Sequence, residues 1–146
     1  MTHKINRSAL VHFTPRQMFD LVNDIETYPQ YMDGCQEATI LARGDGWLEA
    51  RLVLSKGGIS QSFVTRNQLL PPESMTMNLV DGPFKQLQGC WRFTPLGDSA
   101  CKVSFDLSFE LQNRLLGMAV GKLFETVAGK QVDALCARAQ KIYGSK

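Results

Sequence analysis

Apolar and polar residues alternate along the stretch from Ala100 to Leu111. Successive side chains of a β-strand point to opposite faces, so this pattern predicts a strand with one apolar and one polar face. Such strands are typical of antiparallel sheets that are covered on a single side. The chain therefore needs a second layer over the apolar face. The apolar positions of this strand are Cys101, Val103, Phe105, Leu107, Phe109 and Leu111.

Turn signals divide the middle of the chain into further strands. Five clusters rich in glycine, proline and aspartate interrupt the segment from Cys35 to Leu111, and they predict six strands. Another strand is predicted from Lys4 to Phe13. The five clusters are Gly44-Asp45-Gly46, Lys56-Gly57-Gly58, Pro71-Pro72-Glu73, Asp81-Gly82-Pro83 and Gly97-Asp98-Ser99.

Two short helices are predicted between the first strand and the other six. Thr14 suits the N-cap position, Pro15 suits the first helical position, and Gln17 completes a capping box. Pro29 predicts a break in the helix, after which a second short helix runs to Gly34.

The segment from Asn113 to Tyr143 predicts one long helix, because its apolar residues recur at spacings near 3.6. Such a helix would be about 45 Å long, which is enough to cross a sheet of several strands. We therefore expect an α+β fold in which a curved antiparallel sheet of about seven strands wraps around a long C-terminal helix. The expected order is strand, two helices, six strands, helix, in a single domain over residues 1–146.

A straight helix on a strongly twisted sheet leaves a gap near its middle. The gap is either filled by side chains or is a ligand pocket, which would have a volume of about 300 Å³ or more. Gly117, Gly121 and Gly129 lie in the predicted helix, where glycine usually has a packing or access reason. They indicate either close contact between helix and sheet or a thinned pocket wall.

The sequence contains no convincing catalytic or metal-binding pattern. His3 and His12 are predicted to lie on opposite faces of the first strand, so they cannot share a metal ion. Phosphate-loop and nucleophile-elbow motifs are absent, and no two carboxylates stand out as an acid–base pair. We therefore expect a binding protein with no catalytic residue, no metal and no required cofactor. The four cysteines contain no CxxC pair and are expected to be reduced: Cys35, Cys90, Cys101 and Cys136.

Composition indicates an ordinary soluble protein. Hydrophobic residues make up 44% and charged residues 21%, and no apolar run approaches the roughly 18 residues of a membrane span. The net charge of +2 is too small to indicate DNA binding. Between Lys122 and Lys146 five basic residues accompany two acidic ones, which predicts a mildly basic helix face. We expect a cytoplasmic location, with membrane contact that is peripheral and transient at most.

Four runs of sequence carry a resemblance to a known family. They are LVNDIETYPQYMDGC at 21–35, KGGISQSFVTRNQL at 56–69, MNLVDGPFKQLQGCWRFTPL at 77–96 and ACKVSFDLSFELQNRLLGMAVGKLF at 100–124. Together they cover most of the chain. They resemble the coenzyme Q-binding branch of the START-like superfamily, which includes the bacterial RatA ribosome-association toxins.

The resemblance implies a helix-grip fold and two alternative functions. One is binding of ubiquinone or a related polyprenyl lipid between sheet and helix, in support of respiration. The other is binding to the large ribosomal subunit, which blocks subunit association and inhibits translation. A small aromatase or cyclase of the wider superfamily is a third and more remote alternative.

Aromatic and aliphatic residues far exceed what a minimal core needs, although a plain aromatic core would also explain them. For the lipid-binding alternative we predict ten lining residues. They are Tyr28, Tyr31, Phe84, Trp91, Phe105, Phe109, Val120, Leu123, Phe124 and Val127.

Overall fold

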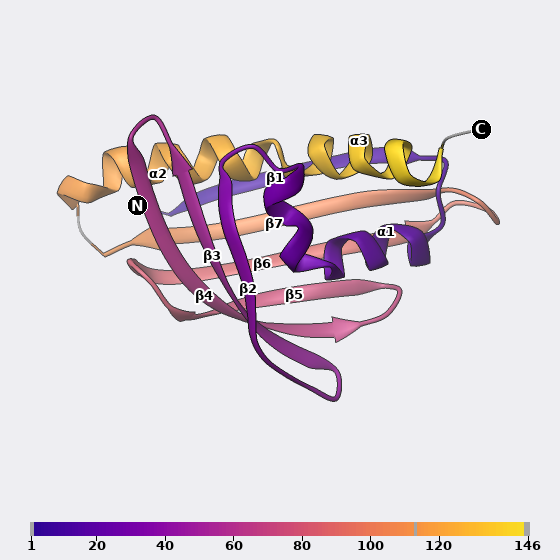
Figure 1. The fold of residues 1–146 in the computed structure, drawn as a ribbon, viewed down its shortest axis with the longest axis horizontal. Coiled ribbons are helices and arrows are strands. Elements are labelled where there is room, and N and C mark those ends of the chain that lie inside the picture. The colour runs from indigo at the N-terminus through magenta and orange to yellow at the C-terminus, as the bar shows by residue number, and fades with distance from the viewer. Residues whose placement is uncertain (1, 113, 145–146) are drawn as a thin grey trace.

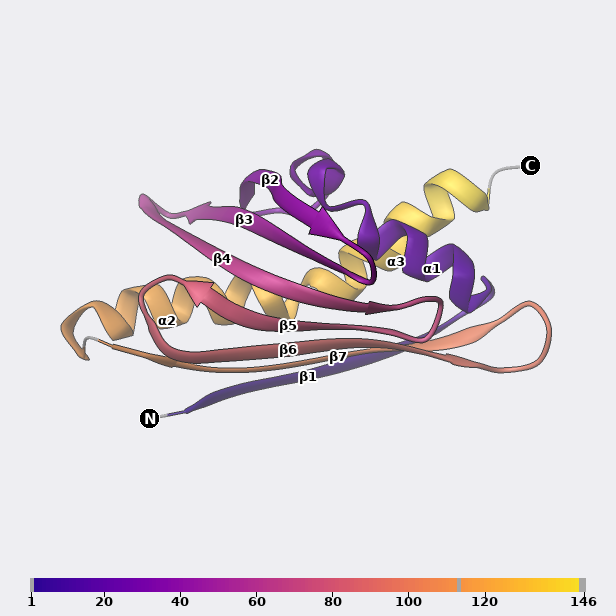
Figure 2. The same ribbon diagram turned by 90° about the horizontal axis from the view of Figure 1, so that it is seen from below.

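A seven-stranded antiparallel sheet wraps around two consecutive C-terminal helices (Figures 1 and 2). The computed structural model describes residues 2–112 and 114–144, with residues 114–117 described without their side chains. The strand order is β1-β7-β6-β5-β4-β3-β2. The elements are β1 (His3–Val11), α1 (Pro15–Asn23), the 3-10 helix η1 (Ile25–Gln30), β2 (Cys35–Gly44), β3 (Trp47–Lys56), β4 (Ile59–Leu70), β5 (Ser74–Asp81), β6 (Phe84–Pro95), β7 (Cys101–Leu111), α2 (Arg114–Gly129) and α3 (Gln131–Tyr143).

The first strand of the chain pairs with the last one. His3 lies opposite Phe109, and Val11 lies opposite Cys101. Each of the five predicted turns separates two neighbouring strands of the continuous run from β2 to β7. The predicted fold class is confirmed: a curved antiparallel sheet of seven strands grips the C-terminal helical segment. In Figure 1, β2–β4 run across the direction of β5–β7, which shows how strongly the sheet bends.

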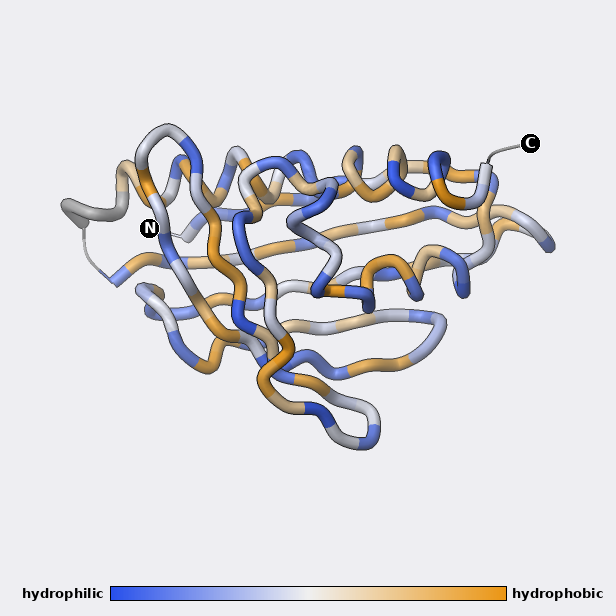
Figure 3. The backbone as a smooth tube through the Cα atoms, viewed as in Figure 1, coloured by the Kyte–Doolittle hydropathy of each residue, from blue (hydrophilic) through white to orange (hydrophobic). Residues whose placement is uncertain are grey.

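The alternation along β7 separates a buried face from an exposed one. Val103, Phe105 and Phe109 are at most 2% exposed, whereas Lys102 faces solvent. The buried face packs against α2 and α3, which contribute their own buried residues to the same core. In Figure 3, hydrophobic and hydrophilic residues alternate around the turns of both helices. The helical core residues are Val120, Leu123, Phe124, Val127, Ala128, Val132, Leu135 and Ala139.

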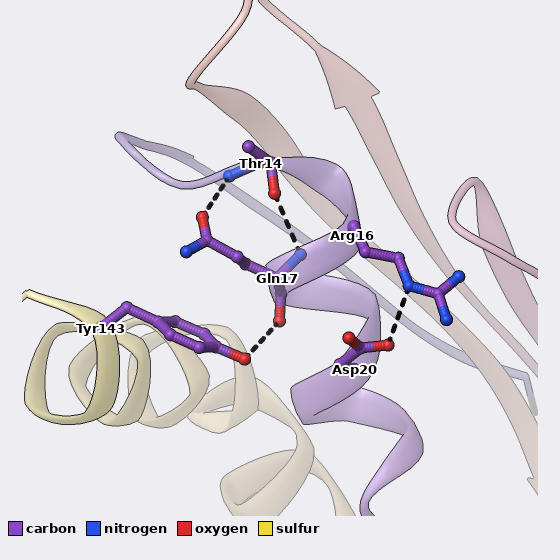
Figure 4. Close-up of polar contacts among 5 residues, drawn as sticks. All are labelled: Thr14, Arg16, Gln17, Asp20 and Tyr143. Atoms are coloured by element: carbon purple, nitrogen blue, oxygen red, sulfur yellow. Dashed lines mark hydrogen bonds and ion pairs between the residues drawn. The ribbon is translucent and has the colours of Figure 1, made fainter.

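Helix α1 begins with the predicted capping box (Figure 4). The backbone N–H of Gln17 donates to Thr14 Oγ1 at 3.1 Å, and the backbone N–H of Thr14 donates to Gln17 Oε1 at 2.8 Å. The Tyr143 hydroxyl, at the end of α3, donates to the Gln17 carbonyl oxygen at 3.1 Å. Through this contact the C-terminal helix is tied to the first helix of the chain.

The predicted long C-terminal helix is present, but it is bent at Lys130 into α2 and α3, and the sequence analysis did not predict this bend. Gly129 ends α2, and Lys130 has φ −103° and ψ −2°. The Lys130 N–H bonds to the Val127 carbonyl, three residues back, at 3.2 Å. Glycine is a poor helix former, which favours a break at this point, and the bend lets both helices follow the curved sheet. The predicted start at Asn113 lies outside the described residues.

Pro29 does not break the first helical segment where we predicted. Helix α1 ends at Asn23, Asp24 has ψ 66°, and η1 then contains Pro29 and ends at Gln30 rather than Gly34. A short 3-10 helix tolerates proline there because the missing N–H removes a single weak bond. Strand β1 also ends two residues earlier than predicted, so His12 lies beyond it.

Candidate functional site

A small apolar cavity lies between the inner face of the sheet and the helices. Its volume is about 50 Å³. Strands β3–β7 form its floor, η1 contributes Ile25 and Tyr28, α2 contributes Phe124 and Ala128, and α3 contributes Gln131. The predicted gap under the C-terminal helix is therefore present, close to the junction of α2 and α3.

The cavity is much smaller than a usual ligand site, which measures about 300 Å³ or more. At about 50 Å³ it can hold one or two small groups. A larger ligand could enter only if α2 or the side chains beneath it moved away from the sheet.

Aromatic rings fill the neighbouring part of the gap. Phe84 and Phe124 meet edge to face with their centroids 4.8 Å apart, and the Phe63 ring lies 5.1 Å from that of Phe124. Phe109 packs against the same cluster, with its centroid 5.7 Å from Phe124. On the cavity wall, Trp91 and Phe105 stack at 4.4 Å. The many aromatic residues of the sequence are therefore shared between the core and the cavity wall.

A polar pair interrupts the apolar wall. Thr65 and Asn67 lie on β4, they are 5% and 2% exposed, and both line the cavity. The Thr65 hydroxyl donates to Asn67 Oδ1 at 2.8 Å. Buried polar groups are costly without partners, so this pair places hydrogen-bonding capacity inside an otherwise apolar site.

The ten predicted lining residues do not gather in one place. Tyr28, Trp91, Phe105 and Phe124 lie on the cavity wall. Tyr31 lies away from it: the guanidinium carbon of Arg138 is 5.1 Å from its ring centroid, and burial raises the pKa of the Tyr31 hydroxyl above its usual value. The other five are buried in the core beside the cavity without lining it: Phe84, Phe109, Val120, Leu123 and Val127.

The Tyr28 hydroxyl donates to the Val22 carbonyl oxygen, so it secures η1 to α1. Only the ring of Tyr28 is thus available to the cavity. The hydrogen bond forms because η1 follows α1 directly after Asp24, which brings Tyr28 back to the end of α1.

Our sequence reasoning did not single out Thr65, Asn67 or Gln131. A signal for the first two was present, because Phe63, Thr65 and Asn67 alternate along β4 and share the inner face. Gln131 carries no such signal, since it reaches the cavity through the break between the two helices.

Gly121 and Gly129 do not thin the cavity wall, and a Cβ atom at either position would make ordinary van der Waals contact. A Cβ atom on Gly121 would lie 3.4 Å from Leu111 Cδ1, and one on Gly129 would lie 3.5 Å from the Arg7 guanidinium. Both positions face β1 and β7 rather than the cavity. The side-chain surroundings of Gly117 lie outside the described residues.

The cysteines and acidic residues form no cluster suited to a metal. Within residues 2–112 and 114–144 there is no group of three or more His, Cys, Asp or Glu side chains that could bind one. The four cysteines are free thiols, and burial raises the pKa of Cys35 and of Cys101 to about 11. No described helix is long and apolar enough to cross a membrane.

Two further grooves lie on the surface. One, of about 470 Å³, runs over the polar outer face of β1, β5, β6 and β7 and includes Lys4 and Arg92. The other, of about 520 Å³, lies between the β3–β4 turn and α2, and Leu123 lines it together with Lys56 and Lys122. Both are more open to solvent than the cavity under the helices.

The chain is similar to a known protein family and to several characterised proteins. The family model described as polyketide cyclase/dehydrase and lipid transport matches residues 11–136. The chain is 46% identical to the ribosome association toxin RatA of Escherichia coli, over 98% of this chain and 90% of that protein. It is 42% identical to RatA of Pseudomonas aeruginosa, over 99% of this chain and all of that protein. Identity to the mitochondrial coenzyme Q-binding protein COQ10 homolog B of Xenopus laevis is 27%, over 95% of this chain and 59% of that protein.

Solved structures share the fold. The 18 kDa protein CC1736 of Caulobacter crescentus is 30% identical and superposes with a TM-score of 0.77, over 98% of this chain and 99% of that one. The ZhuI aromatase/cyclase of a Streptomyces species has a TM-score of 0.84 at 15% identity, over 97% of this chain and 95% of that one. At such low identity the second match shows a common fold alone.

Proposed function

The chain belongs to the polyketide cyclase/dehydrase and lipid transport family, and on this premise we propose that it is a non-catalytic lipid-binding protein. Its ligand would be ubiquinone or another polyprenyl lipid, bound between the sheet and α2. The observation that carries the proposal is the cavity there, whose wall is apolar and aromatic except for Thr65, Asn67 and Gln131. The name of the COQ10 relative supports a quinone as ligand.

Binding of so large a ligand requires the cavity to expand from about 50 Å³. The break at Lys130 divides the helical cover into two segments, so α2 can shift without unfolding α3. Flexible side chains such as Met77 also lie on the wall, and methionine adapts readily to a new shape. We expect the ligand to open the site as it binds, at a cost in affinity.

Trp91 offers a direct test because it lies on the cavity wall and stacks on Phe105. The only other tryptophan is Trp47, which does not line the cavity. The guanidinium carbon of Arg66 lies over its ring, 4.4 Å from the centroid. In a Trp47→Phe variant the fluorescence therefore reports on Trp91. Titration with decylubiquinone should quench this fluorescence and raise the melting temperature.

Extraction of the purified protein with organic solvent, followed by mass spectrometry, would identify a lipid that copurifies. The proposal fails if no lipid is found and added decylubiquinone changes neither fluorescence nor melting temperature. Detergent without quinone is the control for unspecific effects on Trp91.

A second function, association with the large ribosomal subunit, is favoured by a separate observation. The RatA proteins of Escherichia coli and Pseudomonas aeruginosa match at 46% and 42% identity over nearly the whole chain. Exposed Lys122, Lys130 and Lys141 on the helical segment would supply phosphate contacts to ribosomal RNA. A cavity beneath the helices and a basic surface outside them can coexist, so the two functions do not exclude each other.

A further inference from the structure

The amide of Asn67 is the least expected group in the core. Among the described residues, Thr65 and Asn67 are the buried polar side chains, and both point to the inner face of β4. Asn67 lies opposite Leu48 on β3 and Met77 on β5 in the sheet register. An asparagine in this apolar row is costly unless its hydrogen-bonding groups are satisfied.

The contacts of Asn67 fix the orientation of its amide. Its oxygen accepts from the Thr65 hydroxyl, and its nitrogen lies 3.5 Å from the Met75 sulfur. A thioether sulfur has no proton to donate and accepts only weakly, so the nitrogen rather than the oxygen must face Met75. The amide nitrogen carries two protons, and this sulfur engages at most one of them.

Within the described part of the chain, no protein oxygen accepts a hydrogen bond from the Asn67 amide nitrogen. Because Asn67 also lines the cavity, a group bound there is within reach of an amide nitrogen whose one protein partner among the described residues is the weakly accepting Met75 sulfur. We propose that Asn67 recognises the polar end of the bound lipid by donating a hydrogen bond to an oxygen of that lipid. This inference rests on the proposed lipid-binding function and adds the position and chemistry of the headgroup.

The cavity wall also limits the charge of that headgroup. None of its sixteen lining residues is charged. An anionic headgroup would be desolvated there without a cation, which is strongly unfavourable. The polar end is therefore a neutral oxygen acceptor, such as the carbonyl or ether oxygen of a quinone, rather than a phosphate or a carboxylate.

Three probes with the same ten-carbon tail test this assignment: decylubiquinone, decylbenzene and decyl phosphate. Their affinities are measured from Trp91 fluorescence in the Trp47→Phe background. We expect decylubiquinone to bind about tenfold more tightly than decylbenzene, which corresponds to one net hydrogen bond. Decyl phosphate should bind more weakly than either.

Two variants remove the donor. Asn67→Leu, and Thr65→Val combined with Asn67→Leu, should each weaken decylubiquinone binding about tenfold relative to decylbenzene binding. The double variant replaces both hydrogen-bonding partners with apolar groups of similar shape, so its melting temperature without ligand should not fall. Asn78→Leu is the matched control, because Asn78 is an exposed amide on the outer face of β5 that bonds to Gln88.

The outcomes separate this inference from the function on which it rests. If the parent protein binds decylbenzene and decylubiquinone equally, or if both variants weaken the two ligands alike, Asn67 does not recognise the oxygen although lipid binding stands. If the parent binds none of the probes, the proposed function fails and the inference fails with it. A preference for decyl phosphate would also overturn the assignment of a neutral headgroup.

Discussion

Gly89 lies in the middle of the sheet, where it pairs with Met77 on β5 and Leu107 on β7. A Cβ atom at this position would lie 2.6 Å from Met77 Cε and 3.2 Å from Leu107 Cδ1. The absent side chain leaves room that the end of Met77 occupies. Since Met77 and Leu107 also line the cavity, Gly89 influences the shape of the site without belonging to its wall.

We predict that Gly89→Ala destabilises the protein by about 1 kcal/mol, at the low end for overpacking because the Met77 side chain is flexible. Urea denaturation would measure the change in the free energy of unfolding. Met77→Leu combined with Gly89→Ala should lose less stability than the sum of the two single changes, because leucine lacks the clashing terminal methyl group. Strictly additive effects would contradict this explanation.

The buried thiols permit a prediction about reactivity. Burial raises the pKa of Cys35 and of Cys101 to about 11, and alkylation requires the thiolate. At pH 8 about one such thiol in a thousand is ionised, so iodoacetamide should label both residues slowly in the native protein. The labelling rate should increase as the pH rises toward 11.

Peptide mapping by mass spectrometry would give the rate for each cysteine, and the urea-unfolded chain supplies the control. Native Cys35 or Cys101 that reacts as fast as in the unfolded chain would show that burial does not protect the thiol. The two buried cysteines thus test the core independently of any ligand.

At the scale of single elements, the start of α1 depends on the Thr14 and Gln17 pair. We predict that Thr14→Ala destabilises the protein by about 1 kcal/mol, because the Gln17 N–H loses its side-chain acceptor. Thr14→Ser keeps the hydroxyl, so its free energy of unfolding should remain close to that of the parent protein. Chemical denaturation of all three proteins measures the effect.

Tyr143→Phe tests the contact between α1 and α3 in the same assay. It removes the hydroxyl that donates to the Gln17 carbonyl, and the expected loss is about 1 kcal/mol. If neither Thr14→Ala nor Tyr143→Phe changes the unfolding midpoint, these hydrogen bonds contribute nothing net to stability.

At the scale of the whole molecule, the helical surface is the part that a ribosome would meet under our second proposed function. We predict that Lys122→Glu combined with Lys141→Glu weakens cosedimentation with isolated large ribosomal subunits. Two fewer phosphate contacts should reduce the slope of log affinity against log salt by about two. Melting temperature should change little, because both lysines are exposed.

Lys102→Glu is the control for one reversed charge, since Lys102 is exposed on the outer face of β7, away from the helices. An equal loss of ribosome affinity per reversed charge in the two variants would indicate a general charge effect rather than a surface on the helical segment. Absence of the parent protein from the large-subunit fraction at low salt would refute ribosome association itself.

Local patterns in the sequence were sufficient for most of the elements. The alternation from Cys101 to Leu111, the five turns and the cap at Thr14 each involve neighbouring residues, and all reappear in the structure. The helix break at Lys130 was missed because apolar spacing continues across it, from Val127 to Leu135. The spacing of apolar residues shows which face of a helix is buried. A bend that keeps the same face toward the sheet does not change this spacing.

The site depended instead on which distant residues meet. Phe84, Phe109 and Phe124 were predicted to line a pocket. They pack against each other and close part of the gap, and of the three Phe124 alone reaches the cavity wall. Tyr31 turns toward Arg138, and Asn67 reaches the cavity between Leu48 and Met77. Composition and alternation therefore establish an apolar interior under a helical cover, because these follow from local periods. The volume of the remaining space and the place of the Asn67 amide beside it arise from close packing of segments far apart in the chain, which no local pattern encodes.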